Sequence, residues 1–325
     1  MVNALNLLMG FLLDFFLGDP GGKWHPVVGI GKLVEGVEKI LFPRERHFRR
    51  EFALGFVVVG IMVGGLGVSY FFLRRFLYSY SLVLFSMVEA YLIFNFLSLR
   101  TLLRRGEEVK QALDEGDLSQ ARASLKNLVG RDTDHLSEWE VVRGCVESLA
   151  ENFNDGVMAP LFYISLFGAL GGLIYKIINT LDSMLGYKDF RYFFFGFASA
   201  RADDILNFLP SRLSVIFIAL AASMLGRWGR NALFVAFRDA RKHESPNAGW
   251  PESAMAGALG VRLGGVNYYG GKREESPFLG DFVLDLTPER IGEALSVVRL
   301  SSFLALGFWV LVSILVSILV GKVWW

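Results

Sequence analysis

Apolar and polar residues alternate along the chain in blocks as long as whole membrane helices. A helix needs about 20 consecutive apolar residues to cross the hydrocarbon core of a bilayer. Six stretches approach this length, and they are predicted to be membrane-embedded helices: 1–17, 52–73, 77–99, 157–178, 205–225 and 301–320. The pattern therefore predicts an all-α, multi-pass integral membrane protein with about four to six membrane-embedded helices.

Three of these segments are weaker than the others. Segment 1–17 is short and contains Asp14. Because it lacks a basic start and a small-residue cleavage site, it is expected to be a retained helix rather than a signal peptide. Segment 205–225 contains Pro210 and Arg212. Segment 157–178 is either a span or a re-entrant segment, and the sequence leaves both readings open.

Three long polar loops separate the spans, at 18–51, 100–156 and 226–299. They hold most of the 33 lysines and arginines. Because positively charged loops stay on the cytoplasmic side, six spans in the cell membrane place these three loops in the cytoplasm. Both termini would then face outward. The polar segment 179–204 then falls on the opposite side, unless 157–178 is re-entrant. The whole chain, 1–325, is expected to form a single membrane-embedded domain.

Composition supports a membrane protein and excludes several other classes. Of the 325 residues, 53% are apolar and 20% are charged, against about 25% charged in soluble domains. A net charge of +1 gives no field that would attract nucleic acid, so the expected partner is the lipid bilayer. The one cysteine, Cys145, excludes an internal disulfide and a cysteine-based zinc site.

Two groups of polar residues stand where the first and fourth spans meet water. Asp19 and His25 lie in a Gly- and Pro-rich turn directly after the first span, where polar groups either cap helices or serve function. Glu147, Glu151 and Asp155 are spaced four apart and share one helical face, where like charges repel. A metal ion, a basic group or plain solvation would relieve that repulsion.

Two further groups lie around the fifth span and in the last loop. The first contains five residues suited to magnesium or phosphate, although aspartates also cap helices: Asn179, Asp182, Arg201, Asp203 and Asp204. The second contains Arg241, Asn247 and Trp250, in a loop made rigid by two prolines. Arginine can receive phosphates and tryptophan can carry a planar ligand, whereas a membrane-surface anchor is the simpler reading of the basic cluster.

Taken together and in order, these stretches resemble the CobD/CbiB family of cobalamin biosynthesis, the adenosylcobinamide-phosphate synthases. The resemblance rests on collinear motifs from residue 13 to about 265: LDFFLGDP, HPVVGIG, GRDT, ESLAENFNDGVMAPLFY, NTLDSMLGY, FASARADDILNFLPSRL and HESPNAGWPESAMAGALGVRLGG. One departure is Glu244, where the family often has proline.

The resemblance implies an ATP- and Mg²⁺-dependent carbon–nitrogen ligase. Such an enzyme joins adenosylcobyric acid to aminopropanol, usually as its phosphate, and gives adenosylcobinamide or its phosphate. Other late cobalamin-pathway membrane enzymes are possible partners. No recognisable nucleotide-binding motif is present, and GVNYYGGK at 265–272 is rejected as a phosphate loop because it lacks the Ser or Thr.

Within this reaction, each group of residues receives an expected role. Asp182, Asp203 and Asp204 are expected to bind Mg²⁺–phosphate. His25 is the expected general base because its ordinary pKa lies near working pH. The remaining expected site residues are Asp19, Glu151 and Asp155 for catalysis and Arg131, Asn179, Arg201, Arg241, Asn247 and Trp250 for substrate binding.

Two other functions remain open at this stage. Asp14, Glu89 and Arg212 inside predicted spans would suit the path of a transporter for a charged metabolite. The missing nucleotide motif would suit a non-catalytic membrane scaffold for corrinoid assembly. Proteoliposome uptake and product formation by the purified protein distinguish these readings.

Overall fold

The computed structural model describes residues 2–19, 21–22, 25–43, 45, 47–186 and 190–319. The chain divides into two compact units. The expectation of a single membrane-embedded domain over 1–325 stays a prediction. Unit 1 contains Met1–Ser98, Ala159–Leu206 and Phe308–Trp325, and unit 2 contains Leu99–Met158 and Asn207–Gly307. Two helices pass from one unit to the other without a break, so no linker marks the boundary in the sequence.

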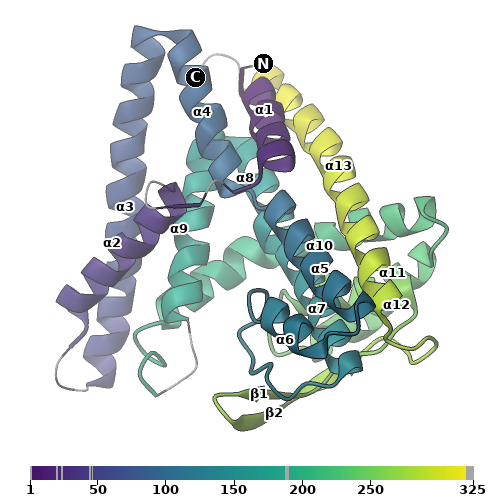
Figure 1. Ribbon diagram of the computed structural model, residues 1–325. Helices are drawn as coiled ribbons and strands as arrows, with labels where there is room; N and C mark the ends of the chain where they lie inside the picture. Colours follow the sequence, from purple (N-terminus) through teal and green to yellow (C-terminus); the bar gives the residue numbers. More distant parts are fainter. Residues whose placement is uncertain are drawn as a thin grey trace. The chain divides into compact units, whose positions relative to one another are not determined.

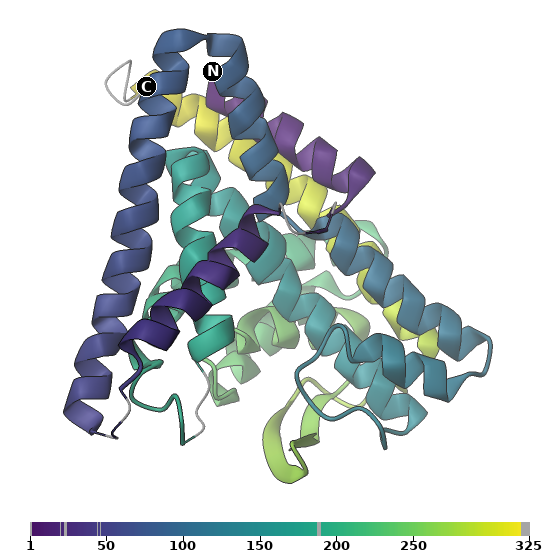
Figure 2. The same ribbon diagram turned by 60° about the vertical axis from the view of Figure 1, so that its left-hand side comes forward.

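Unit 1 is helical. Its complete helices are α1 (Val2–Leu17), α2 (Pro26–Leu41), α3 (Phe48–Tyr80), α4 (Leu82–Phe96), α8 (Ala159–Phe167) and α9 (Ala169–Leu185). Helices α3 and α4 lie side by side in both ribbon views (Figures 1 and 2). Their turn is fixed by Ser81, whose side chain accepts a hydrogen bond from the Leu84 N–H and caps α4. Apolar residues of α2, α3 and α9, among them Val34, Val58 and Leu181, form a common core.

The predicted span 157–178 is not one continuous helix. Helix α8 ends at Phe167, Gly168 takes a φ of +67°, and α9 begins at Ala169. A left-handed residue of this kind ends a helix, and glycine adopts it without steric cost. Gly171 and Gly172 then let α9 pass close to Tyr163 and Ile164 of α8. The apolar run is therefore split between two short helices.

Four helical stretches are long and apolar enough to cross a membrane among the residues described: Phe48–Tyr80, Leu82–Asp114, Phe197–Met224 and Pro288–Leu319. They contain the predicted span 52–73, the predicted span 205–225 up to residue 224, and the predicted span 301–320 up to residue 319, because residue 320 lies outside the described part. The predicted span 77–99 coincides largely with α4. The predicted first span forms α1, which is shorter than the other four. The all-α, multi-pass membrane architecture is thus confirmed.

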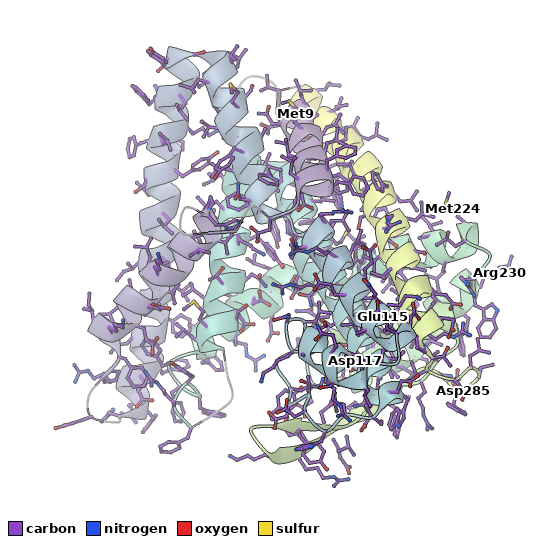
Figure 3. The ribbon with its side chains drawn as sticks, in the orientation of Figure 1. Met9, Glu115, Asp117, Met224, Arg230 and Asp285 are labelled. Atoms are coloured by element: carbon purple, nitrogen blue, oxygen red, sulfur yellow. The ribbon has the colours of Figure 1, made fainter. Side chains whose placement is uncertain are left out.

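Unit 2 contains most of the residues predicted as polar loops, and these are largely helical. Its complete elements are α5 (Leu99–Asp114), α6 (Leu118–Leu125), α7 (Glu138–Phe153), the π-helical turn η1 (Asn154–Met158), α11 (Gly229–Asp239), the 3₁₀ turn η2 (Ala240–Lys242) and α12 (Gly249–Leu259). Figure 3 labels Glu115 and Asp117 in the turn between α5 and α6. Asp117 caps α6, since its carboxylate accepts a hydrogen bond from the Gln120 N–H at 2.8 Å.

An antiparallel β-hairpin completes unit 2, and sequence analysis did not foresee it. Strand β1 (Leu263–Tyr269) pairs with β2 (Lys272–Leu279) through a turn at Gly270 and Gly271, which both have positive φ. A Gly-Gly pair is a common signal for such a turn. Helices α10 (Phe197–Met224) and α13 (Pro288–Leu319) each contribute to both units. Helix α13 begins at Pro288, within the predicted polar loop 226–299, and continues into the last predicted span.

Candidate functional site

Unit 2 holds a buried network of ionic and hydrogen-bonding side chains on one face of α7. The helix begins with a capping box, in which Ser137 and Glu140 satisfy the first backbone donors. Glu147 then accepts a hydrogen bond from Arg131 at 2.5 Å, and the two side chains are 7% and 9% exposed. Arg143, one turn earlier, lies 3.8 Å from the same carboxylate. A basic group therefore relieves the predicted repulsion at Glu147.

Two glycines let the hairpin approach this network. Gly264 and Gly265 have φ values of +84° and +103°, at a β-bulge where β1 begins. The Gly264 N–H donates to Glu147 at 2.7 Å, and Arg143 donates to the Gly264 carbonyl at 2.6 Å. A Cβ on Gly265 would stand 2.8 Å from the Arg143 guanidinium. Glycine is therefore required here, because a side chain would separate the strand from α7.

A cavity of about 190 Å³ opens beside the network. Its polar and charged lining comes from α7, α12, β1 and two loops. The lining includes Glu147 and Glu151 of α7, Glu252 of α12, Asn267 and Tyr269 of β1, and the loop residues Arg131 and His243. Glu252 is 7% exposed, whereas Glu151 and Tyr269 are exposed. Burial, together with the negative charges of Glu151 and Glu147, raises the pKa of the Glu252 carboxyl well above its usual value. The cavity thus has carboxylates both at its buried end and at an exposed edge.

Unit 1 holds a second group of carboxylates, formed by α9 and the start of α10. Asp203 accepts a hydrogen bond from the Asn179 amide at 3.4 Å, and Asp204 pairs with Arg201 at 2.8 Å. Asp182 lies near both aspartates: burial, with their negative charges, raises its pKa to about 7. The structure therefore brings together the five residues that the sequence placed in one group.

The unit 1 carboxylates suit a magnesium–phosphate ligand better than a metal site made by protein alone. Among the described residues, no three His, Cys, Asp or Glu side chains are arranged to hold a metal ion by themselves. Magnesium, however, is commonly bound through one or two carboxylates, with water and substrate phosphates completing the shell. The mutual repulsion at Asp182 is the feature that a cation would relieve. The residues present therefore fit the expected ion.

His25 caps helix α2 and faces Asp19. Its Nδ1 accepts a hydrogen bond from the Val27 N–H at 3.2 Å, and its Nε2 lies 3.3 Å from the Asp19 carboxylate. Burial lowers the pKa of His25, Asp19 raises it by less, and Lys176 also lowers it. The ring is therefore neutral at pH 7, as a general base requires. This arrangement assigns the ring proton to Nε2 and engages the Nδ1 lone pair in the cap.

The other predicted site residues lie in varied surroundings. Asp155 lies in the π-helical turn and accepts a hydrogen bond from Asn154 at 2.8 Å. Asn247 is buried and accepts one from Arg212 at 3.2 Å. Trp250 is also buried, with the Arg212 guanidinium 4.9 Å from its ring centre. Arg241 is exposed. The roles of these residues remain predictions.

Sequence reasoning missed three residues of the unit 2 cavity: His243, Glu252 and Asn267. Asn267 accepts hydrogen bonds from Arg131 at 2.5 Å and Arg143 at 2.8 Å, so it joins the two arginines. It lies in the segment rejected as a phosphate loop, where the alternation of strand residues before Gly-Gly was the useful signal. For Glu252, burial is the informative property, and no sequence pattern reveals it.

Comparison with known proteins agrees with the motifs. The sequence profile of the family described as "CobD/Cbib protein" matches residues 7–298. The chain is 45% identical over 277 residues to cobalamin biosynthesis protein CobD of Geobacter metallireducens, covering 85% of this chain and 86% of that protein. It is 39% identical over 310 residues to cobalamin biosynthesis protein CbiB of Salmonella paratyphi B, covering 93% and 95%.

A third relative, cobalamin biosynthesis protein CobD of Clostridium perfringens, is 36% identical over 308 residues, covering 93% of this chain and 95% of that protein. No solved structure matches the chain significantly. The profile and the relatives cover the residues that build both groups of carboxylates. The chain therefore belongs to the CobD/CbiB family and takes part in cobalamin biosynthesis.

Proposed function

We propose that the protein is an ATP-dependent amide ligase that converts adenosylcobyric acid into adenosylcobinamide or its phosphate. The second substrate is aminopropanol or aminopropanol phosphate. Family membership supplies the corrinoid context, and the carboxylate group of unit 1 supports the ATP dependence. The single observation that carries the proposal is Asp182, whose carboxyl lies close enough to Asp203 and Asp204 for their charges to raise its pKa.

The reaction requires activation of a carboxylate. A propionate oxygen of the corrinoid attacks a phosphorus atom of ATP, and a mixed anhydride forms as ADP or pyrophosphate leaves. The amine nitrogen then attacks the acyl carbon, the C–N bond forms, and phosphate or AMP leaves with the former carboxylate oxygen. Bound Mg²⁺ supplies charge neutralisation for the phosphates. Asp182 and Asp203 would hold it, while Arg201 holds Asp204 in place.

The amine must lose a proton, and His25 is the proposed acceptor. The lowered pKa keeps its ring neutral, and Asp19 would stabilise the imidazolium that forms. Accepting the proton at Nδ1 requires that nitrogen to release the Val27 N–H. This requirement predicts a small movement at the start of α2 during turnover.

Two of the three intramembrane charges, Glu89 and Arg212, favour an enzyme over a transporter. Glu89 accepts a hydrogen bond from the Tyr70 hydroxyl and lies 3.7 Å from Arg74. Arg212 donates to the Phe208 carbonyl at 2.6 Å and stacks on aromatic rings. Because these groups are satisfied within their own units, they do not need a permeating ion as a partner.

Mass spectrometry of purified, detergent-solubilised protein tests the proposal. The protein is incubated with ATP, Mg²⁺, aminopropanol phosphate and adenosylcobyric acid labelled with ¹⁸O in its free carboxylate. The proposal predicts product together with one ¹⁸O atom in the released phosphate or AMP. Product without ¹⁸O transfer would exclude activation by ATP. No product from folded protein that binds both substrates would favour the scaffold.

A further inference from the structure

The cavity of unit 2 contains a buried carboxylate that lacks a matching donor. Glu252 lies in the first turn of α12 and is 7% exposed. Among the described residues, none donates a hydrogen bond to its carboxylate. The His243 Nε2 lies 3.8 Å from it, beyond hydrogen-bond distance. A buried carboxylate in this state is costly unless it is protonated or meets a cation.

The charges around Glu252 are unequal. Glu147, its neighbour in the cavity, already has Arg131, Arg143 and the Gly264 N–H as partners. Glu151, at the exposed edge, adds negative charge next to Glu252. Arg131 pairs with Glu147 and also attracts Glu252, but the repulsion of Glu252 by Glu151 and Glu147 is larger, so the Glu151–Glu252 side of the cavity is acidic. A ligand that settles there gains most if it carries a positive charge.

The volume and the lining of the cavity limit which ligands can bind in it. The cavity volume is about 190 Å³. This is below the roughly 300–1,000 Å³ of pockets for drug-sized ligands, so the cavity suits a ligand smaller than ATP or a corrinoid ring. His243 and Tyr269 line the cavity together with its carboxylates, so the lining offers hydrogen bonds as well as negative charge. These features suit a small organic cation with hydrogen-bonding groups.

We propose that this cavity binds the ammonium group of a small amine, with Glu252 and Glu151 as its charge partners. The Tyr269 hydroxyl and the His243 ring, which also line the cavity, offer hydrogen bonds to a neighbouring hydroxyl or phosphate oxygen of the same molecule. The ammonium replaces the missing donor of Glu252 and offsets its repulsion by Glu151. If the proposed ligase function holds, on which this identification rests, the amine is the nucleophilic substrate before it loses its proton.

Calorimetric titration of the full-length protein in detergent, without ATP or corrinoid, tests the site. The probe is 1-aminopropan-2-ol, and propane-1,2-diol is the matched ligand in which a hydroxyl replaces the ammonium. We expect the amine to bind at least about tenfold more tightly than the diol, because a charge-assisted hydrogen bond is lost. Glu252→Gln and Glu151→Gln should each weaken amine binding by about tenfold. Glu115→Gln, an exposed change between α5 and α6, should leave it unaltered.

A melting curve separates loss of binding from loss of folding. Glu252→Gln removes a buried, repelled carboxylate, so its unfolding temperature should equal or exceed that of the wild type. The exposed Glu151 provides a second variant that does not disturb the core. Equal affinity of the wild type and both variants for the amine would overturn the proposal, as would absence of amine binding to the wild type or equal binding of the diol. If the protein forms the amide product but gives one of these binding results, the amine site is wrong and the proposed function stands. If it binds the amine as expected but forms no product, the ligase function is wrong and the amine site stands.

Discussion

The two units carry carboxylate groups of similar size, but these groups differ in what balances their charge. In unit 2, Glu147 is held by Arg131 and by a backbone N–H, both at hydrogen-bond distance. In unit 1, Asp182 has Asp203 and Asp204 as charged neighbours, and burial with their charges raises its pKa to about 7. In the first arrangement, groups of the protein itself balance the negative charge of Glu147. We propose that an added cation would stabilise the second arrangement.

Unit 2 contains both arrangements within a single cavity. The Glu147 end is compensated by arginine, while the Glu252 end has a buried carboxylate with Glu151 close enough to repel it. A row of acidic residues along a helix therefore does not define a site by itself. A carboxylate that pairs with a cationic side chain of the same fold has a structural role. A carboxylate without enough positive charge around it is available to bind a cationic ligand.

Removing Arg131, the cation that pairs with Glu147, should have the largest effect on the unfolding free energy. Arg131→Gln leaves Glu147 charged and 7% exposed, and breaking such a pair should cost about 3 kcal/mol of unfolding free energy. Arg201→Gln breaks the pair with Asp204, but Arg201 is 61% exposed, so its loss should cost under about 1 kcal/mol. Thermal unfolding followed by tryptophan fluorescence measures both. Equal losses of unfolding free energy in the two variants would contradict the proposed difference between the units.

Changing the carboxylate group of unit 1 should affect turnover more than folding. Asp203→Asn keeps the size of the side chain and removes its charge, so the ligation rate should fall about 100- to 1,000-fold. The unfolding temperature should stay within a few degrees of the wild type. Glu115→Gln serves as the control that changes one exposed carboxylate elsewhere. Unaltered product formation by Asp203→Asn would remove this residue from the phosphate site.

His25 tests whether the cap and the proposed base are the same group. Asparagine is a good N-cap but a poor base, so His25→Asn should keep stability and lose about 100-fold in rate. His25→Ala should lose a similar factor in rate and also about 1 kcal/mol of stability. Rate and stability are measured on both variants. Normal turnover by the His25→Asn variant would show that His25 caps α2 but does not act as the general base.

The smallest effect is a pH dependence that belongs to unit 1. The pKa of Asp182 rises from 3.8 to about 7 on folding. Between these values the folded chain binds more protons than the unfolded chain, so stability falls as pH rises from about 4 to about 7. Asp182→Asn removes this term. After allowance for solvent screening, the variant should be about 1 kcal/mol more stable than the wild type at pH 8 and equal to it at pH 4. The same difference at both values would exclude the charge effect.

The sequence was sufficient to predict the long helices and to place the carboxylates of unit 1 close together, whereas their role in a site stays a prediction. Apolar length alone predicts α3, α10 and α13, because a membrane helix must satisfy its backbone and hide it in apolar side chains. Asp182 and Asp203 lie on separate helices, yet their residue types and the shared motif region grouped them correctly. Local chemistry was enough in these cases.

Long-range packing explains what the sequence did not reveal. The break at Gly168 depends on a backbone angle, and the apolar run around it looks continuous. The partners of Glu147 come from a loop 16 residues away and from a hairpin 117 residues away in the chain. Glu252 looked like part of a rigid loop, because its burial depends on α7 and β1 packing beside α12. Such features follow from tertiary contacts, which hydrophobic periodicity does not encode.

Thermal unfolding with and without Mg²⁺ at pH 8 tests most directly whether unit 1 alone needs an added divalent cation. We predict that millimolar Mg²⁺ raises the unfolding temperature of the wild type and of Glu252→Gln by a few degrees, because a ligand that binds only the folded state stabilises it. The shift should disappear in Asp182→Asn and Asp203→Asn. An equal shift in all four proteins, or a shift lost only in Glu252→Gln, would contradict the account.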